Sequence, residues 1–160
     1  MTMIGVISYI DAAHGAHMSA KSHLGASHTI GAGAIEAASS TISVNTKSAC
    51  ESECIALSEQ ATNSMRLRNF LMGQGRQQQP AIATQDDESA IKLAENGFSS
   101  ASRARHINVR RLFVKDRIAN GETQVRHCPT KSMIADALTK PLQGQLFLEL
   151  RDLSLGYVQA

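Results

Sequence analysis

The stretch AIATQDDESAIKLAENG, residues 81–97, combines a strand pattern with a helix pattern. AIATQD is predicted to be a strand, and ESAIKLAENG a short helix that ends at Gly97 in a C-cap position. Three acids stand side by side at the junction, and each negative charge disfavours the next. Asp87 suits the N-cap of the helix and Glu88 its positive end. Asp86 is therefore the acid without a local structural role.

Outward from this unit, the chain alternates between strand and helix patterns. Further strands are predicted at 4–11, 27–31, 35–44 and 122–128, and further helices from 48 to about 72 and at 106–121, 132–140 and 145–153. In the first of these helices, Cys50, Cys54, Leu57, Ala61 and Met65 form one apolar stripe. The order β-β-β-α-β-α-α-β-α-α predicts an α/β fold, with a mixed sheet and helices on its faces.

Length and composition indicate one globular domain over residues 1–160, without a linker or an internal repeat. No apolar run approaches the roughly 20 residues that span a bilayer. The N-terminus lacks the basic and small-residue features of a signal peptide. Three cysteines with no ligand-like spacing indicate free thiols in a reducing compartment. We therefore expect an intracellular protein, in the cytoplasm, a virus-like particle or the nucleus, and not a secreted one.

The net charge of +2 predicts no partner, but basic residues are concentrated in one segment. SASRARHINVRRLFVKDR, residues 100–117, has six arginines and lysines against a single acid, Asp116. Such a segment could contact phosphates, or it could be the solvated face of a helix.

Counting Asp86, four carboxylates fall at the boundaries of predicted elements: Asp11, Glu51, Asp86 and Asp136. Active sites of open α/β sheets gather at strand ends. Acids that converge there cannot all stay ionised without cations between them. Oxygen ligands of this kind suit Mg²⁺ or Mn²⁺, and two such ions can promote cleavage of a phosphodiester.

Local roles would also explain three of the four acids. Asp11 could begin the turn DAAHG, and Asp136 within MIADAL could lie on a solvated helix face. Glu51 matches a capping box with Ser48, in which its carboxylate reaches back to the Ser48 N–H. These alternatives stay open on spacing alone.

At these residues the chain resembles the ribonuclease H domain of copia-type LTR retrotransposons, over roughly residues 6–153. YIDAAHGAH is similar to the family's YVDAD or DASFGVH, and QDDESAIKLAE to xDNQSAIxLAx. SRARHINVRRLFVKDRIANGE is similar to SRTKHIDIRYHFIRExVxxGE, and PTKSMIADALTKPL to PTxxxxADILTKPL. The last two matches are long and specific.

The resemblance implies a ribonuclease H-like fold, with a five-stranded mixed sheet flanked by helices on both faces. It implies an endonuclease that cleaves the RNA strand of RNA·DNA hybrids during reverse transcription, beside the reverse transcriptase domain of the same polyprotein. Asp11, Glu51, Asp86 and Asp136 would be its catalytic residues and would hold two Mg²⁺ or Mn²⁺ ions. The alternative is an impaired or solitary remnant that binds nucleic acid or a reverse transcriptase without turnover.

The motif leaves a choice between two glutamates. The family's SSTEAE stands here as SACESE, and only the match to the first glutamate favours Glu51; Glu53 is a possible accessory residue. His106, at the start of the basic helix, is either an accessory proton carrier or a structural residue. In this interpretation the basic segment grips the phosphates of the hybrid, without reading its sequence, through Arg103, Arg105, Arg110, Arg111 and Lys115.

Overall fold

The computed structural model describes residues 5–96 and 105–157. Its strands are β1 (Ile7–Ala13), β2 (His23–Thr29), β3 (Ala34–Thr41), β4 (Ala81–Gln85) and β5 (Thr123–His127). Its helices are α1 (Ala49–Gly73), α2 (Glu88–Asn96), α3 (Arg105–Ala119), α4 (Asp136–Thr139) and α5 (Gly144–Leu155), with a 3-10 turn, η1 (Thr130–Ser132). The predicted element order is confirmed, and the helix predicted at 132–140 is shorter because η1 and an irregular segment precede it.

The five strands form one mixed sheet in the order β3-β2-β1-β4-β5. β1 pairs antiparallel with β2 and parallel with β4, β3 pairs antiparallel with β2, and β5 pairs parallel with β4. The chain therefore adds β2 and β3 on one side of the central strand β1, and β4 and β5 on its other side. The carboxyl ends of β1 and β4 lie side by side there, which is where ligands bind in open α/β sheets.

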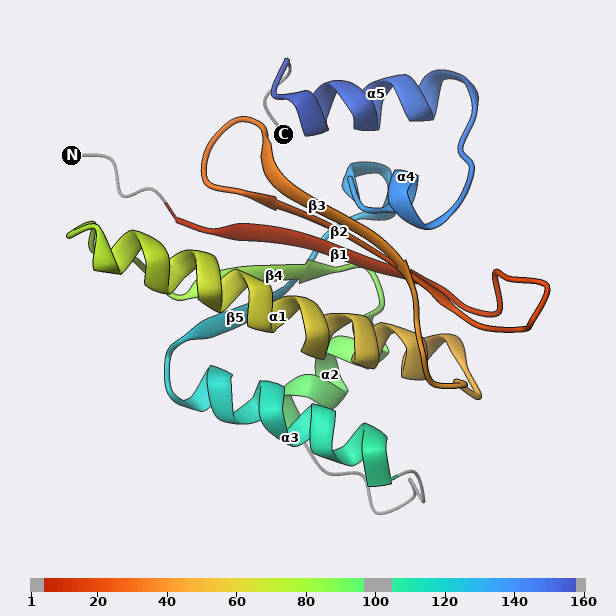
Figure 1. The fold of residues 1–160 in the computed structure, drawn as a ribbon, viewed down its shortest axis with the longest axis horizontal. Helices are drawn as coiled ribbons and strands as arrows, with labels where there is room; N and C mark the ends of the chain where they lie inside the picture. The colour runs from red at the N-terminus through yellow and green to blue at the C-terminus, as the bar shows by residue number, and fades with distance from the viewer. Residues whose placement is uncertain (1–4, 97–104, 158–160) are drawn as a thin grey trace.

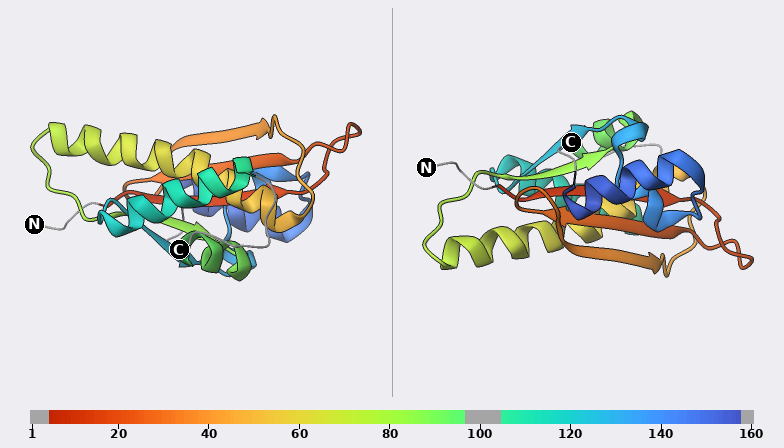
Figure 2. Two further views of the ribbon diagram at one scale, coloured as in Figure 1. Left: turned by 90° about the horizontal axis from the view of Figure 1, so that it is seen from below. Right: turned by 90° about the horizontal axis from the view of Figure 1, so that it is seen from above.

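Helices cover both faces of this sheet, as predicted (Figure 1). The further views show α1 and α3 on one face, and α4 and α5 on the other (Figure 2). Because successive strand residues point to opposite faces, Ile10 of β1 joins the buried cluster that contains Ile55 of α1 and Ile107 of α3. Tyr9, one residue earlier, packs instead against the smaller cluster that contains Met133.

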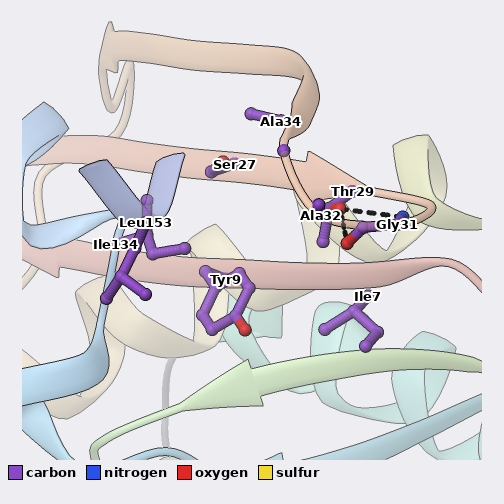
Figure 3. Close-up of a pocket in the computed structure, with 10 residues that line it drawn as sticks. Ile7, Tyr9, Ser27, Thr29, Gly31, Ala32, Ala34, Ile134 and Leu153 are labelled. Atoms are coloured by element: carbon purple, nitrogen blue, oxygen red, sulfur yellow. Dashed lines mark hydrogen bonds between the residues drawn. The ribbon is translucent and has the colours of Figure 1, made fainter. Parts of the chain in front are cut away.

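Small residues in β2 and β3 shape the face that α4 and α5 cover. A Cβ atom at Gly25 would lie 2.7 Å from the carbonyl oxygen of Ala135, so only glycine lets α4 approach β2 this closely. Farther along the same face, a cavity of about 440 Å³ lies between the sheet and α5. Tyr9, Ser27, Ile134 and Leu153 are among its lining residues (Figure 3).

No helix within the described ranges has the length and apolar character needed to cross a membrane.

Candidate active site

Three carboxylates converge at the carboxyl ends of β1 and β4. They belong to Asp11 in β1, Glu53 in the second turn of α1 and Asp86, which directly follows β4. One oxygen atom of each lies within 4.8 Å of the others, and these three are the only such group of potential metal ligands in the described part of the chain. The tertiary fold thus gathers acids that are up to 75 residues apart in sequence.

Asp11 is buried, with 6% of its surface exposed, and the Thr139 hydroxyl donates a hydrogen bond to its Oδ2. Thr139 belongs to α4, which lies on the face of the sheet opposite to α1 and contacts Asp11 from there (Figure 2). Burial raises the pKa of Asp11; the Thr139 hydrogen bond opposes this rise, and the charges of Asp136 and Asp86 add to it. Burial thus shifts this carboxyl toward its protonated form relative to an exposed aspartate, and a nearby cation would oppose that shift.

Glu53 is the most strongly perturbed acid of the group. The Ala12 N–H donates to its Oε1 (3.0 Å), and the side-chain amide of Gln85 donates to its Oε2 (3.1 Å). Two strands therefore fix the orientation of this carboxylate. Burial, followed by the charge of Asp11, raises the pKa of Glu53 to about 9. Such a group ionises at neutral pH only when positive charge arrives.

Asp86 is held at the mouth of the site by η1, where the Thr130 hydroxyl donates to its Oδ2 (3.0 Å). Asp87 caps α2, since its Oδ1 accepts from the N–H groups of Ser89 (2.7 Å) and Ala90 (3.1 Å). Glu88 lies in the first turn of α2 and pairs with Lys92 at 3.6 Å. The structural roles predicted for Asp87 and Glu88 are therefore confirmed, and Asp86 turns toward the other acids.

The structure corrects the expectation for Glu51. Its Oε2 accepts a hydrogen bond from the Lys47 N–H (2.8 Å), and its own N–H donates to the Ser48 hydroxyl (3.2 Å). Glu51 thus completes the N-terminal cap of α1, reaching back to Lys47 instead of Ser48. A helix turns about 100° per residue, so Glu51 and Glu53 point in very different directions. Glu53, expected only as an accessory, is the glutamate that joins Asp11 and Asp86.

Asp136 lies beside this group but outside the set of three. It is buried at the start of α4, and its Oδ1 forms an ion pair with Lys140 Nζ at 2.5 Å. The charge of Asp136 contributes to the raised pKa of Asp11, so the two carboxylates are close enough to repel each other. The Asp136 hydrogen bond, and then the charges of Asp136, Asp11 and Asp86, raise the pKa of Lys140 against its partial burial.

The composition of the site suits a divalent cation of the Mg²⁺ or Mn²⁺ type. All the candidate ligand atoms are carboxylate oxygens, without a sulfur or imidazole nitrogen among them. Two of the three acids are buried and have raised pKa values, so their ionised forms lack compensating charge. A cation at this position would supply that charge.

The basic segment divides into inward and outward residues. Arg111 is buried, with 6% of its surface exposed, and lies against Cys54, which removes it from any phosphate-binding surface. Arg105 and Lys115 are exposed, whereas Arg110 is partly buried and pairs with Glu59 at 3.8 Å. Arg103 lies outside the described residues. The prediction for Arg111 was wrong because α3 turns that position toward α1.

His106 is exposed in the first turn of α3, so its accessory role stays a prediction. The positioning residues Gln85, Thr130, Thr139 and Lys140 were not predicted at all. For Thr139 and Lys140 a signal existed, because both follow Asp136 within one helical turn and belong to the matched ADALTKPL segment. Nothing in the sequence distinguished Gln85 from other strand residues.

No protein-family model matches the sequence. The chain is 31% identical over 127 residues to the retrovirus-related Pol polyprotein from transposon TNT 1-94 of Nicotiana tabacum. The match covers 79% of this chain but only 10% of that polyprotein, so the chain spans about a tenth of its relative.

Solved structures share the fold at low sequence identity. A ribonuclease H1 isolated from compost superposes with a TM-score of 0.64 at 16% identity, covering 85% of this chain and 93% of that one. Ribonuclease H1 from Halobacterium salinarum gives 0.56 at 16% identity, with coverage of 84% and 93%. A foamy viral protease-reverse transcriptase, solved with an RNA/DNA hybrid, gives 0.58 at 14% identity, with coverage of 87% and 20%.

Proposed function

Because this chain is a ribonuclease H domain of the LTR-retrotransposon type, we propose that it cleaves the RNA strand of RNA·DNA hybrids by metal-dependent phosphodiester hydrolysis. The observation that carries the proposal is the convergence of Asp11, Glu53 and Asp86 at the strand switch point of this fold. Acids so placed are suited to divalent cations, because carboxylates held this close together repel one another unless a cation neutralises them.

The catalytic set we propose is Asp11, Glu53, Asp86 and Asp136, which would hold two Mg²⁺ or Mn²⁺ ions. When bound, the ions would activate a water molecule and stabilise the departing 3′ oxygen. The protein contributes oriented ligands: Gln85 and the Ala12 N–H fix both oxygens of Glu53, and Thr139 fixes Asp11. These preset hydrogen bonds reduce the reorganisation that the carboxylates need during the reaction.

Nucleic-acid contacts in this proposal come from the outward residues of the basic segment. Arg105 and Lys115 are exposed along α3 and can meet backbone phosphates, and Arg110 can do so if it leaves Glu59. Phosphate contacts position a duplex without reading its sequence. A hybrid differs from DNA in its groove shape and in the 2′-hydroxyls of its RNA strand. We therefore propose cleavage that is largely indifferent to sequence.

The partner that we propose is the reverse transcriptase domain of the same polyprotein. The chain corresponds to a small part of the matched Pol polyprotein, and the foamy viral relative of the same fold contains a reverse transcriptase in one chain. Such a partner would add contacts to the hybrid beyond those of α3.

The decisive experiment is cleavage of an end-labelled RNA·DNA hybrid with Mg²⁺ or Mn²⁺, beside double-stranded RNA and an EDTA control. We expect metal-dependent cutting of the hybrid alone, with 3′-hydroxyl and 5′-phosphate ends. Asp86→Asn should abolish it, and Glu51→Gln, the matched control, should not. If the folded protein leaves the hybrid intact, with and without an added reverse transcriptase, the proposed function is wrong.

A further inference from the structure

The fourth acid of the site already has a cation. Lys140 Nζ lies 2.5 Å from Asp136 Oδ1, and the Asp136 side chain is only 4% exposed. The Lys140 side chain is 48% exposed, so its stem leads outward while its ammonium group reaches into the site. Within the described residues, no ion pair of this kind is formed by Asp11, Glu53 or Asp86.

Lys140 is held in this place by α4 itself. It stands four residues after Asp136, at the C-cap of this one-turn helix, and its N–H donates to the Asp136 carbonyl. Thr139, the preceding residue, hydrogen-bonds Asp11. Neighbouring residues of one turn thus serve two acids: Thr139 orients Asp11, and Lys140 neutralises Asp136.

Two cations that bind the same carboxylate oxygen repel each other, which raises the free energy of that arrangement. An ion such as Mg²⁺ binds oxygen at about 2.0–2.1 Å, and a lysine at hydrogen-bond distance from the same oxygen would be strongly repelled. Lys140 therefore competes with a metal ion for that oxygen, and its charge also opposes a metal ion at the other oxygen of Asp136. The other three acids impose no such condition.

We propose that Lys140 is a built-in counter-ion of Asp136 that keeps the second metal position closed until a substrate phosphate draws its ammonium group away. This proposal rests on the metal site of the proposed function. It makes Lys140 a positioning residue whose exposed stem allows the movement: the groove beside it is lined by His17, His23 and Pro141 and is open to solvent. The free protein then binds one divalent ion well and a second poorly.

The test is calorimetric titration of the nucleic-acid-free protein with MnCl₂. We expect one Mn²⁺ for the parent protein and for Lys140→Arg, which keeps the charge. Lys140→Met should bind a second Mn²⁺ at least tenfold more tightly than the parent. Lys92→Met removes a surface lysine that pairs with Glu88 and should behave like the parent.

Folding is checked separately, since Lys140→Met leaves Asp136 buried without its partner. The double variant Asp136→Asn, Lys140→Met removes both charges and should bind one ion, as the parent does. Two ions of equal affinity in the parent, or unchanged binding in Lys140→Met, would overturn the inference while leaving the metal site intact. If the folded parent binds no Mn²⁺ at millimolar concentrations, the proposed metal-dependent function itself fails.

Discussion

Gly25 lies directly opposite Asp11 in the β1–β2 ladder, and the space that a side chain at Gly25 would need is filled by α4 and the residue before it. A Cβ atom there would lie 2.7 Å from both the Ala135 carbonyl oxygen and Thr139 Cγ2. The absence of a side chain thus lets α4 reach Asp11 with the Thr139 hydroxyl.

Gly25→Ala should therefore displace α4 and loosen the site. Overpacking of this kind costs about 1–3 kcal/mol, and a weaker Thr139–Asp11 hydrogen bond should also weaken metal binding. Urea unfolding and the rise in melting temperature with Mg²⁺ measure the two effects. Gly31→Ala is the matched control, since nothing lies within 4 Å of a Cβ atom there. Equal stability and metal response in both variants would contradict this role for Gly25.

Glu51 and Glu53 should differ sharply when each is changed to glutamine. Glu53→Gln removes a carboxylate that can ionise when a cation binds to the three-acid group, and should reduce hybrid cleavage by at least 100-fold, with loss of the melting-temperature rise produced by Mg²⁺. Glu51→Gln can still accept from the Lys47 N–H and should retain both properties. Cleavage and thermal denaturation on the same preparations decide between them; the reverse pattern would restore the role first expected for Glu51.

The element order could be predicted because it depends on local patterns. Strands such as AIATQ and the helix cap at Ser48 are determined by a few adjacent residues, and the structure confirms them. The positions of Asp11 and Asp86 at or near strand ends could also be predicted, although the local pattern alone left a turn as an alternative role for Asp11. The periodicity of apolar residues predicts where each strand ends, and the order of the elements predicts that these strand ends lie at one edge of the sheet.

The choice between two glutamates could not be predicted, because it depends on which side of α1 faces β1. Helical geometry places Glu51 and Glu53 symmetrically about the apolar stripe, so only the packed sheet distinguishes them. The Thr139–Asp11 hydrogen bond joins residues 128 positions apart, and Arg111 is buried only because α3 packs on α1. The matched ADALTKPL segment could have singled out Thr139, but no local pattern shows which acid it contacts or that α3 packs on α1.

Exposed and buried members of the basic segment should behave differently toward nucleic acid. Arg105→Gln or Lys115→Gln should weaken binding to a hybrid and reduce the slope of log K against log salt by about 0.9 for each phosphate that the variant no longer neutralises. Arg111→Met, which keeps an unbranched apolar side chain but removes the charge, should leave the slope unchanged, because Arg111 is buried. Fluorescence anisotropy over a salt series, with Asp86→Asn as the background to prevent cleavage, measures both. A reduced slope for Arg111→Met would place this residue at the interface after all.

Stability without metal should fall as pH rises, because of Glu53. Its pKa is about 9 in the folded protein, against an ordinary value of 4.5, so between these values the folded state binds more protons than the unfolded state. The free energy of unfolding therefore decreases with pH across this window, by at most about 1.4 kcal/mol per pH unit for one group. Asp11, whose pKa is also raised, acts in the same direction. Buried His28 acts in the opposite direction, since its lowered pKa costs stability as pH falls below about 6.5.

Urea unfolding in EDTA from pH 7 to 9 avoids most of the His28 titration, and the difference between the parent protein and Glu53→Gln separates Glu53 from Cys54, whose pKa is lowered to about 7. We expect a steady loss of stability in the parent protein and a flatter profile in Glu53→Gln. Millimolar Mg²⁺ should flatten the parent profile as well, since a bound cation favours the ionised carboxylates that high pH produces. Equal profiles for the parent protein and Glu53→Gln in EDTA would show that Glu53 is already ionised without metal, and that its charge needs no cation at this site.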